Sequence, residues 1–140
     1  MFVTVKKIKK RSDCPISSAL DIVGDKWSLL IIRDIALSGK NTYNEFLKSE
    51  EGIATNILAD RLAMLEMAGL LAREGHPESK AKIFYRLTAQ GIDLLPVLVE
   101  IILWSDKYLP ISPQAKQFAK QLRKQKETVV KQISNGLKKR

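Results

Sequence analysis

The sequence contains one cysteine and one histidine in 140 residues, and these scarcities exclude several kinds of site. A single cysteine excludes an internal disulfide framework and a zinc site built from the cysteines of one chain. A single histidine makes a histidine-rich metal centre or a His–Cys catalytic pair a poor prediction. The sequence also lacks a Ser–His–Asp arrangement and a phosphate-binding loop. We therefore expect no enzyme, no metal and no cofactor.

Long apolar runs are also missing. None reaches the length of a membrane span, and no apolar stretch follows the basic N-terminus as a secretory signal requires. The hydrophobic fraction of 45% is nevertheless sufficient for a domain core. We expect a cytoplasmic protein without a membrane partner, in a reducing compartment that suits the lone thiol.

The net charge of +9 is concentrated at the two ends of the chain. Residues 1–13 carry a net charge of +4, and residues 114–140 carry nine Lys or Arg against Glu127 alone, a net charge of +8. The middle, 14–113, has a net charge of −3. Basic ends favour a polyanionic partner, but solvated termini are often basic, so the function must be argued from local pattern.

The first part of the chain has two helical patterns. Pro15 suits the first turn of a helix, whose apolar residues recur at helical spacing until Gly24 ends it. Asp25 is a plausible N-cap for a second helix over 26–37. Because this second segment is apolar on nearly every side, we expect it to be the central, buried helix.

A helix-turn-helix pattern follows. Thr42 and Glu45 match a capping box at the start of a short helix, and Gly52 lies in the turn after it. A longer helix is predicted over 55–68, with one buried stripe formed by Leu58, Leu62 and Leu65. These proportions are typical of a helix-turn-helix.

After Gly69 the apolar period changes from helical to alternating. The pattern predicts strands over 70–74 and 82–88, joined by a polar loop over 75–81. A hairpin directly after the second helix of the motif is a wing.

The C-terminal part is predicted to be helical again. A helix over 89–109 is apolar on two sides, so it needs a partner beyond its own core, and the simplest partner is a second copy. Pro110 to Pro113 breaks the chain, and 114–136 is amphipathic with lysines on its polar side. The expected dimer interface comprises Leu95, Leu98, Val99, Ile102, Trp104, Phe118 and Leu122.

These elements predict a fold that is mainly α, of the α+β class. It is a winged helix-turn-helix with a two-stranded β-hairpin wing and extra C-terminal dimerisation helices. The predicted organisation is a basic arm (1–13), a winged helix-turn-helix domain with its dimerisation helix (14–109) and a basic amphipathic C-terminal helix (110–140).

The motifs occur in a recognisable order. They are Cys14-Pro15, Leu20, Gly24-Asp25-Lys26-Trp27-Ser28, Tyr43-Asn44-Glu45-Phe46, Gly52-Ile53, Asn56 to Leu62, Leu65-Glu66, Gly69-Leu70 and Tyr85 to Gly91. Over about 14–109 the ordered set resembles the HxlR-type branch of MarR-like winged helix-turn-helix regulators. The resemblance implies a dimeric bacterial or archaeal transcriptional regulator that binds a pseudo-palindromic operator, more often as a repressor.

Candidate DNA contacts lie on two elements. The polar face of the helix 55–68 presents Thr55 and Asn56, and Asn can bond adenine bidentately in the major groove. Lysines of the hairpin can lie along phosphates, although an edge strand protected by lysine is an equal interpretation for Lys82. Arg61 lies next to the buried stripe, and pairing with Glu66 or with a neighbouring helix is as good an interpretation as a phosphate contact. The expected set is Thr42, Tyr43, Thr55, Asn56, Ala59, Arg61, Lys80 and Lys82.

Cys14 is the candidate regulatory residue. It lies at the cap of the first helix, where the helix dipole, with Lys10 and Arg11 nearby, favours a thiolate. Without a second cysteine it can form an intersubunit disulfide, a mixed disulfide or a sulfenate. The alternative is a small apolar residue buried at the helix start.

Two functions remain open from the sequence. The first is a DNA-binding regulator whose effector is an oxidant or a small molecule. The second is a winged-helix module that binds protein without specific DNA binding, and the acidic middle of the chain supports it.

Overall fold

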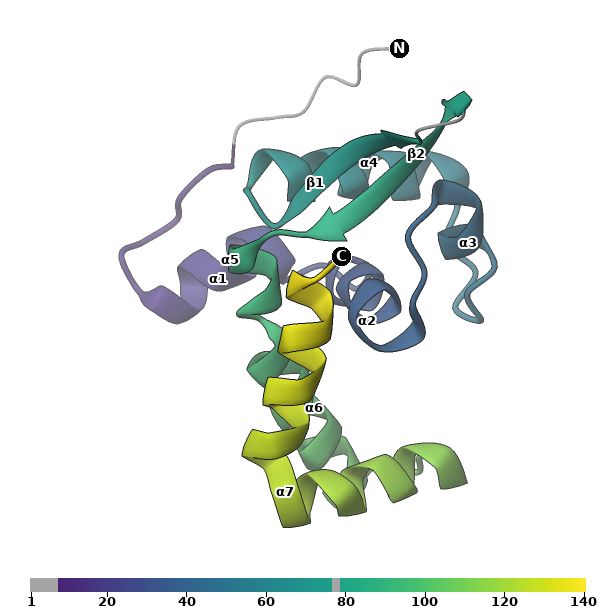
Figure 1. Cartoon of the computed structure of the whole chain (residues 1–140). Helices are drawn as coiled ribbons and strands as arrows, with labels where there is room; N and C mark the ends of the chain where they lie inside the picture. The colour runs from purple at the N-terminus through teal and green to yellow at the C-terminus, as the bar shows by residue number, and fades with distance from the viewer. Residues whose placement is uncertain (1–7, 77–78) are drawn as a thin grey trace. The chain divides into compact units, whose positions relative to one another are not determined.

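The computed structural model describes residues 8–76 and 79–140, and between 76 and 81 it describes only the backbone of the strands. The contacts divide the chain into two units, Met1–Gly91 and Ile92–Arg140 (Figure 1). Among the described residues, no helix combines the length and the apolar character needed to cross a membrane.

The described chain is mainly helical, with one two-stranded antiparallel sheet. Its elements in order are α1 (Pro15–Val23), α2 (Ser28–Ser38), α3 (Tyr43–Leu47), α4 (Thr55–Met67), β1 (Leu71–His76), β2 (Ser79–Leu87), α5 (Ala89–Ile92), α6 (Leu95–Tyr108) and α7 (Pro113–Lys138).

The start of α2 is set by a carboxylate. Asp25 accepts hydrogen bonds from the backbone N–H groups of Trp27 at 3.0 Å and Ser28 at 2.9 Å. These bonds hold the preceding residues in a turn, so the helix begins at Ser28, two residues later than predicted. The interior of α2 is buried as expected, with Ile31 and Ile32 almost fully inaccessible.

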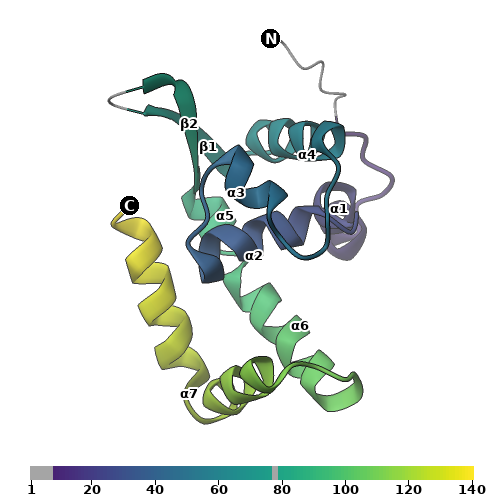
Figure 2. The same cartoon turned by 90° about the vertical axis from the view of Figure 1, so that its right-hand side faces the viewer.

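The helix-turn-helix prediction is confirmed in α3 and α4 (Figure 2). The Thr42 hydroxyl accepts from the Glu45 backbone N–H at 3.3 Å, and the Glu45 carboxylate accepts from the Thr42 N–H at 3.1 Å. This is the predicted capping box. The predicted stripe of α4 is buried; its members are Leu58, Leu62 and Leu65.

The two strands of the wing are longer than predicted. β1 and β2 pair from Leu71 opposite Leu87 as far as Gly75 opposite Ile83, with an irregularity after Gly75. The predicted loop over 75–81 is therefore strand except near its tip. The segment 75–81 consists of small and polar residues, so the alternating pattern that identifies a half-buried strand is absent from the sequence.

The predicted helix over 89–109 is two helices, α5 and α6, separated by a turn. Pro96 lacks a backbone N–H and is therefore suited to the first turn of a new helix, which begins at Leu95. The predicted C-terminal helix is present as α7, but its backbone leaves the helical conformation at Gln125, with φ −141° and ψ 46°.

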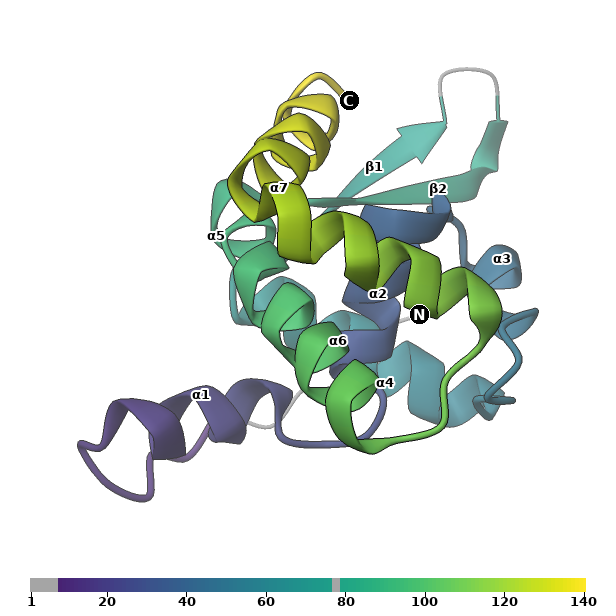
Figure 3. The ribbon, with the colours of Figure 1, turned by 90° about the horizontal axis from the view of Figure 1, so that it is seen from below.

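The break in α7 lets both of its halves pack on α6 (Figure 3). Leu122 and Val129 lie on either side of the break and are buried in one cluster with Val99 of α6. The residues packed against this cluster are Ile102, Leu103, Phe118, Val130 and Ile133.

This packing changes the interpretation of the expected dimer interface. Within one chain, α6 packs against α7 through residues expected at the interface between two chains. They are Val99 and Ile102 of α6 and Phe118 and Leu122 of α7. Leu95 and Leu98 are also buried in the chain. Of the seven expected residues, Trp104 alone is strongly exposed, at 58%. The sequence shows that both sides of α6 are apolar, but it does not show which side α7 covers.

Candidate nucleic-acid interface

A groove of about 610 Å³ separates the start of α3 from strand β2. Three of the expected DNA contacts, Thr42, Tyr43 and Lys82, line it together. The other lining residues are Asn41, Asn44, Glu45, Ile83, Phe84 and Tyr85. The structure thus brings two sequence-distant groups of candidates to one surface.

Backbone pairing fixes the two walls of this groove. Thr42 forms an isolated antiparallel bridge with Phe84, and the Tyr85 N–H donates to the Asn41 carbonyl at 2.8 Å. The Tyr85 ring also packs 6.1 Å from the ring of Phe46, and burial raises the pKa of Tyr85 above its ordinary value. The residues before α3 therefore act as a third, short member of the wing sheet.

The start of α4 is attached to α3 beside the groove. The Tyr43 hydroxyl donates to the Thr55 carbonyl at 2.9 Å. The N-cap of α4 is Ala54, which offers no side-chain acceptor. Thr55 and Asn56 are exposed, and Ala59 is half-buried. The exposed first turn of α4 is thus held by a hydrogen bond from α3 and not by a side-chain cap of its own.

Arg61 is engaged by carboxylates. Its guanidinium lies 2.7 Å from Asp60 and 3.3 Å from Asp25, and its side chain is 18% exposed. The pairing with Glu66 considered from the sequence is not formed, because Glu66 lies 3.2 Å from Arg73 instead. Arg61 connects α4 to the turn before α2.

Asp25 is the acceptor at that connection. Partial burial raises its pKa, but hydrogen bonds from the Ser28 hydroxyl and from the N–H groups of Trp27 and Ser28, together with the charge of Arg61, outweigh burial. The net pKa lies below its ordinary value, so the carboxylate stays ionised.

Of the two candidate lysines of the wing, the structure describes the side chain of Lys82 only. Lys82 is exposed and has no carboxylate partner among the described side chains. The side chain of Lys80 lies outside the described residues. Arg86, further along β2, is paired with Glu74 across the hairpin. Lys82 is therefore the cation that the described wing offers to the groove.

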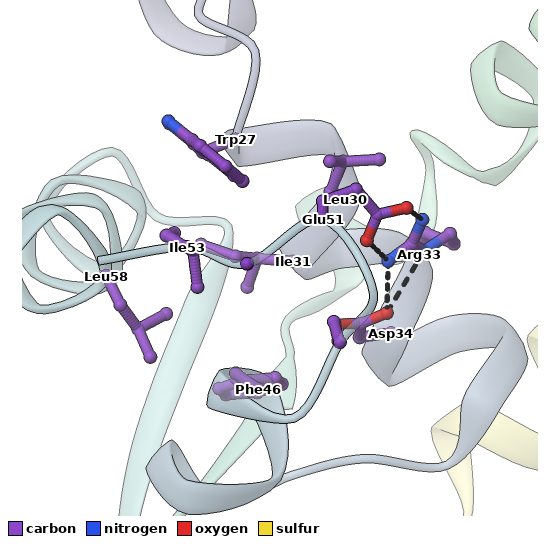
Figure 4. Close-up of a pocket in the computed structure, with 11 residues that line it drawn as sticks. Trp27, Leu30, Ile31, Arg33, Asp34, Phe46, Glu51, Ile53 and Leu58 are labelled. Atoms are coloured by element: carbon purple, nitrogen blue, oxygen red, sulfur yellow. Dashed lines mark hydrogen bonds and ion pairs between the residues drawn. The ribbon is translucent and has the colours of Figure 1, made fainter. Parts of the chain in front are cut away.

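A polar network attaches the turn between α3 and α4 to α2 (Figure 4). The Arg33 guanidinium donates to both carboxylate oxygens of Glu51, at 2.8 and 2.9 Å. Buried Asp34 accepts from Arg33 at 2.8 Å and from the Ser49 hydroxyl at 2.5 Å, while Lys40 donates to Ser49 at 2.8 Å. The turn that precedes α4 is thereby fixed to the central helix.

The network perturbs the acid–base properties of its members. Hydrogen bonding from Arg33 lowers the pKa of Glu51 from 4.5 to about 2, and the same bond raises the pKa of Arg33 above its ordinary value. The sequence analysis missed this network. Its signal was the presence of two charged residues, Arg33 and Asp34, in an otherwise apolar helix.

Cys14 is exposed at the N-cap of α1, so the alternative of a buried thiol is wrong. The two cations expected to favour its thiolate are paired with carboxylates. Lys10 lies 2.7 Å from Asp13, and Arg11 pairs with Asp21.

Comparison with known proteins identifies the family. The HxlR-like helix-turn-helix family model matches residues 22–113. An HTH-type transcriptional regulator of Synechocystis, sll1512, is 35% identical over 86 residues, which are 61% of this chain and 63% of that protein. The matched part thus spans just under two thirds of that relative.

Two solved structures are similar in sequence and fold. The putative transcription factor PA1607 has 42% sequence identity and a TM-score of 0.65, with 74% of this chain and 70% of that chain covered. The oxidised form of the redox regulator HypR has 28% identity and a TM-score of 0.62, with 70% and 100% covered. These similarities confirm the predicted winged helix-turn-helix fold and the resemblance found in the motifs. The chain belongs to the HxlR-like helix-turn-helix family.

Proposed function

We propose that this chain is a cytoplasmic, DNA-binding transcriptional regulator. The observation that carries the proposal is the exposed first turn of α4, which Tyr43 holds beside a groove lined by Lys82. Family membership and the regulator relatives support the same function. No catalytic role is proposed.

The proposed contacts divide between base reading and phosphate binding. Asn56 reads adenine from the major groove, and Thr55 contacts a neighbouring base edge or methyl group. Lys82, Thr42 and Asn44 contact phosphates, which position the protein without reading sequence, whereas the Tyr43 hydroxyl holds Thr55. Arg61 serves to connect α4 to Asp25, because its charge is already balanced by two carboxylates.

We propose that the regulator acts as a dimer through the exposed side of α6. Val97, Ile101, Trp104 and Tyr108 are 42%, 45%, 58% and 61% exposed. Their spacing of four, three and four residues is that of the core positions of a coiled coil. Two copies of this 14-residue helix could therefore cover each other along one seam.

The flanking charges favour an antiparallel pairing. Aligning Ile101 with Trp104 of the second copy places Glu100, which also pairs with Lys126 of its own chain, beside the opposite Lys107, and two-fold symmetry makes this contact twice. A two-fold dimer presents two reading helices to a pseudo-palindromic operator with half-sites about 34 Å apart.

We further propose that the protein is a repressor whose release responds to an oxidant at Cys14 or to a small molecule at the α6 seam. The exposed thiol supports the first signal, and HypR, a structural relative, is named a redox regulator. Oxidation that joins or caps the thiol would change the spacing of the two reading helices.

The test compares operator binding before and after removal of the base-reading side chains. Footprinting upstream of the protein's own gene supplies the operator duplex. We expect Asn56→Ala to weaken operator binding about 5- to 150-fold, with Thr55→Ala weaker in effect and the circular dichroism of both variants unchanged. Exposed Asn135→Ala is the matched control.

A contrary result is equally clear. If the wild type shows no sequence preference in the presence of excess nonspecific DNA, the protein is better described as a protein-binding winged helix. Unchanged operator affinity of Asn56→Ala would remove this residue from the reading set.

A further inference from the structure

The first half of α7 lies outside the part of the chain that the family model matches, which ends at residue 113. Residues 113–124 contain Lys116, Lys120, Arg123 and Lys124 and no acidic residue. This segment is the most uniformly basic stretch of regular structure in the described chain. Its chemistry is therefore not explained by the winged helix-turn-helix motif.

Three of these lysines form a stripe. Lys116, Lys120 and Lys124 are four residues apart, so they lie on successive turns of one helix face, about 6 Å apart along the axis. All three are exposed. The opposite face carries Phe118 and Leu122, which are packed in the cluster with α6. The apolar packing thus fixes the stripe toward solvent.

The lysines of the stripe differ from their cationic neighbours in ion pairing. The two neighbouring cations are occupied, because Arg123 lies 3.0 Å from Asp106 and Lys126 lies 2.5 Å from Glu100. The three lysines of the stripe have no carboxylate partner among the described residues. Apart from Arg123, the exposed side chains between them are Gln117 and Gln121, which are uncharged and able to donate hydrogen bonds.

We propose that the stripe Lys116, Lys120 and Lys124 is a second DNA-binding surface, which contacts the phosphates of duplex DNA without reading sequence. The proposal rests on the function proposed above in its choice of DNA as the polyanion. Lys and Gln are residues that commonly contact phosphate oxygens. Each phosphate that is neutralised releases condensed counterions, and this release supplies affinity.

A membrane surface is less well matched. A basic amphipathic helix binds lipid by inserting its apolar face between headgroups. In α7 that face is covered, since Leu122 and Val129 are buried within the chain. Only the lysines remain for a partner, and phosphates along a duplex can be bound by charge alone.

The experiment measures binding to a random-sequence 30-bp duplex as a function of salt concentration. For three phosphate contacts, we expect the triple variant Lys116→Gln, Lys120→Gln, Lys124→Gln to reduce the magnitude of the slope of log K against log[salt] by about 2.7. The triple Lys→Arg variant keeps the charge and should keep the slope. Both substitutions preserve helix propensity, so α7 should fold in each.

A matched control removes the same charge elsewhere in α7. Lys131→Gln, Lys138→Gln, Lys139→Gln lies beyond the break at Gln125 and should change the slope by less than one. An equal change in this control would overturn the assignment to the stripe. An unchanged slope in the first triple variant would overturn the proposal itself.

Two further probes separate the partner classes and the two proposals. Tighter binding of the wild type to phosphatidylserine vesicles or to single-stranded RNA than to the duplex would overturn the choice of DNA. If sequence preference is absent but the slope still falls in the triple variant, the second surface is supported and the regulator function fails. If sequence preference is present and the slope is unchanged in the triple variant, the regulator function is supported and the second surface is overturned.

Discussion

The Tyr43 hydroxyl on α3 donates a hydrogen bond of 2.9 Å to the carbonyl of Thr55, the first residue of α4. Because the N-cap Ala54 has no side-chain acceptor, this bond substitutes for part of the fixation that a cap residue would give. The position of the proposed reading residues thus depends on a residue of the preceding helix.

Replacing Tyr43 by Phe removes this hydrogen bond and keeps the ring. We expect the unfolding free energy to fall by about 0.5–1.5 kcal/mol, as for loss of one ordinary hydrogen bond. Operator binding should fall several-fold while binding to random duplex is unchanged, as competition assays would measure. Exposed Asn135→Ala is the control, and an equal loss on both duplexes would contradict a positioning role.

Replacing Glu51 by Gln tests the network that attaches the turn to α2. The folded-state pKa of Glu51 is about 2, below the ordinary 4.5, so its ionised form stabilises the fold above pH 4.5. This stability is lost as the pH falls from 4.5 toward 2. We expect the variant to have a lower Tm at pH 7 and the difference from wild type to vanish near pH 2. Thermal unfolding across this range measures it, with Glu50→Gln as control.

Replacing Gly91 by Ala tests the close approach at the end of the wing. An added Cβ would lie 2.2 Å from the Leu70 carbonyl oxygen and 3.1 Å from the Leu87 side chain. We expect a loss of about 1–3 kcal/mol in unfolding free energy, measured by urea titration. At Gly136, inside α7, nothing lies within 4 Å, so Ala should stabilise by about 0.5–1 kcal/mol. Equal changes in unfolding free energy for Gly91→Ala and Gly136→Ala would argue against the close approach of the Leu70 carbonyl to Gly91.

Replacing Ile101 by Asp tests the proposed α6 seam. A charge in the middle of an apolar dimer interface is costly, so we expect the dimer to dissociate into monomers. Sedimentation velocity measures the change. The control is Leu109→Asp, because Leu109 is exposed but lies off the spacing of the seam. A dimer that persists in Ile101→Asp would place the interface elsewhere.

Replacing Cys14 by Ser tests oxidant sensing. Since Cys14 is the only thiol of the chain, we expect an oxidant such as hydrogen peroxide to change the operator affinity of the wild type and not of the variant. Affinity is measured before and after oxidation, and the mass of the oxidised protein distinguishes an intersubunit disulfide from a sulfenate. An identical response of the variant would exclude the thiol as the sensor.

Local signals made much of the fold predictable. The capping box at Thr42 and the buried stripe of α4 depend on residues a few positions apart, so the sequence contains them directly. The division of the C-terminal helices and the burial of Leu122 depend on how α7 folds back on α6 at Gln125, and no local pattern marks that break.

The candidate site was predictable in part for the same reason. Thr55 and Asn56 follow from helix periodicity, and the structure finds both exposed. The network pairs Arg33 with Glu51 and Asp34 with Ser49, which are 18 and 15 positions apart, and no periodicity specifies these pairs. The role of Arg61 depends on Asp25 in the turn before α2, and only the three-dimensional arrangement brings the two together.

The bridge between Thr42 and Phe84 has a mechanical consequence. Because residues 41–42 are hydrogen-bonded along β2, the hairpin cannot tilt about its base without displacing the first residues of α3 in the same direction. A duplex that bends the hairpin would therefore also move Tyr43, and through its hydroxyl the first turn of α4. We therefore expect a deformation of the wing to displace the first turn of α4 as well.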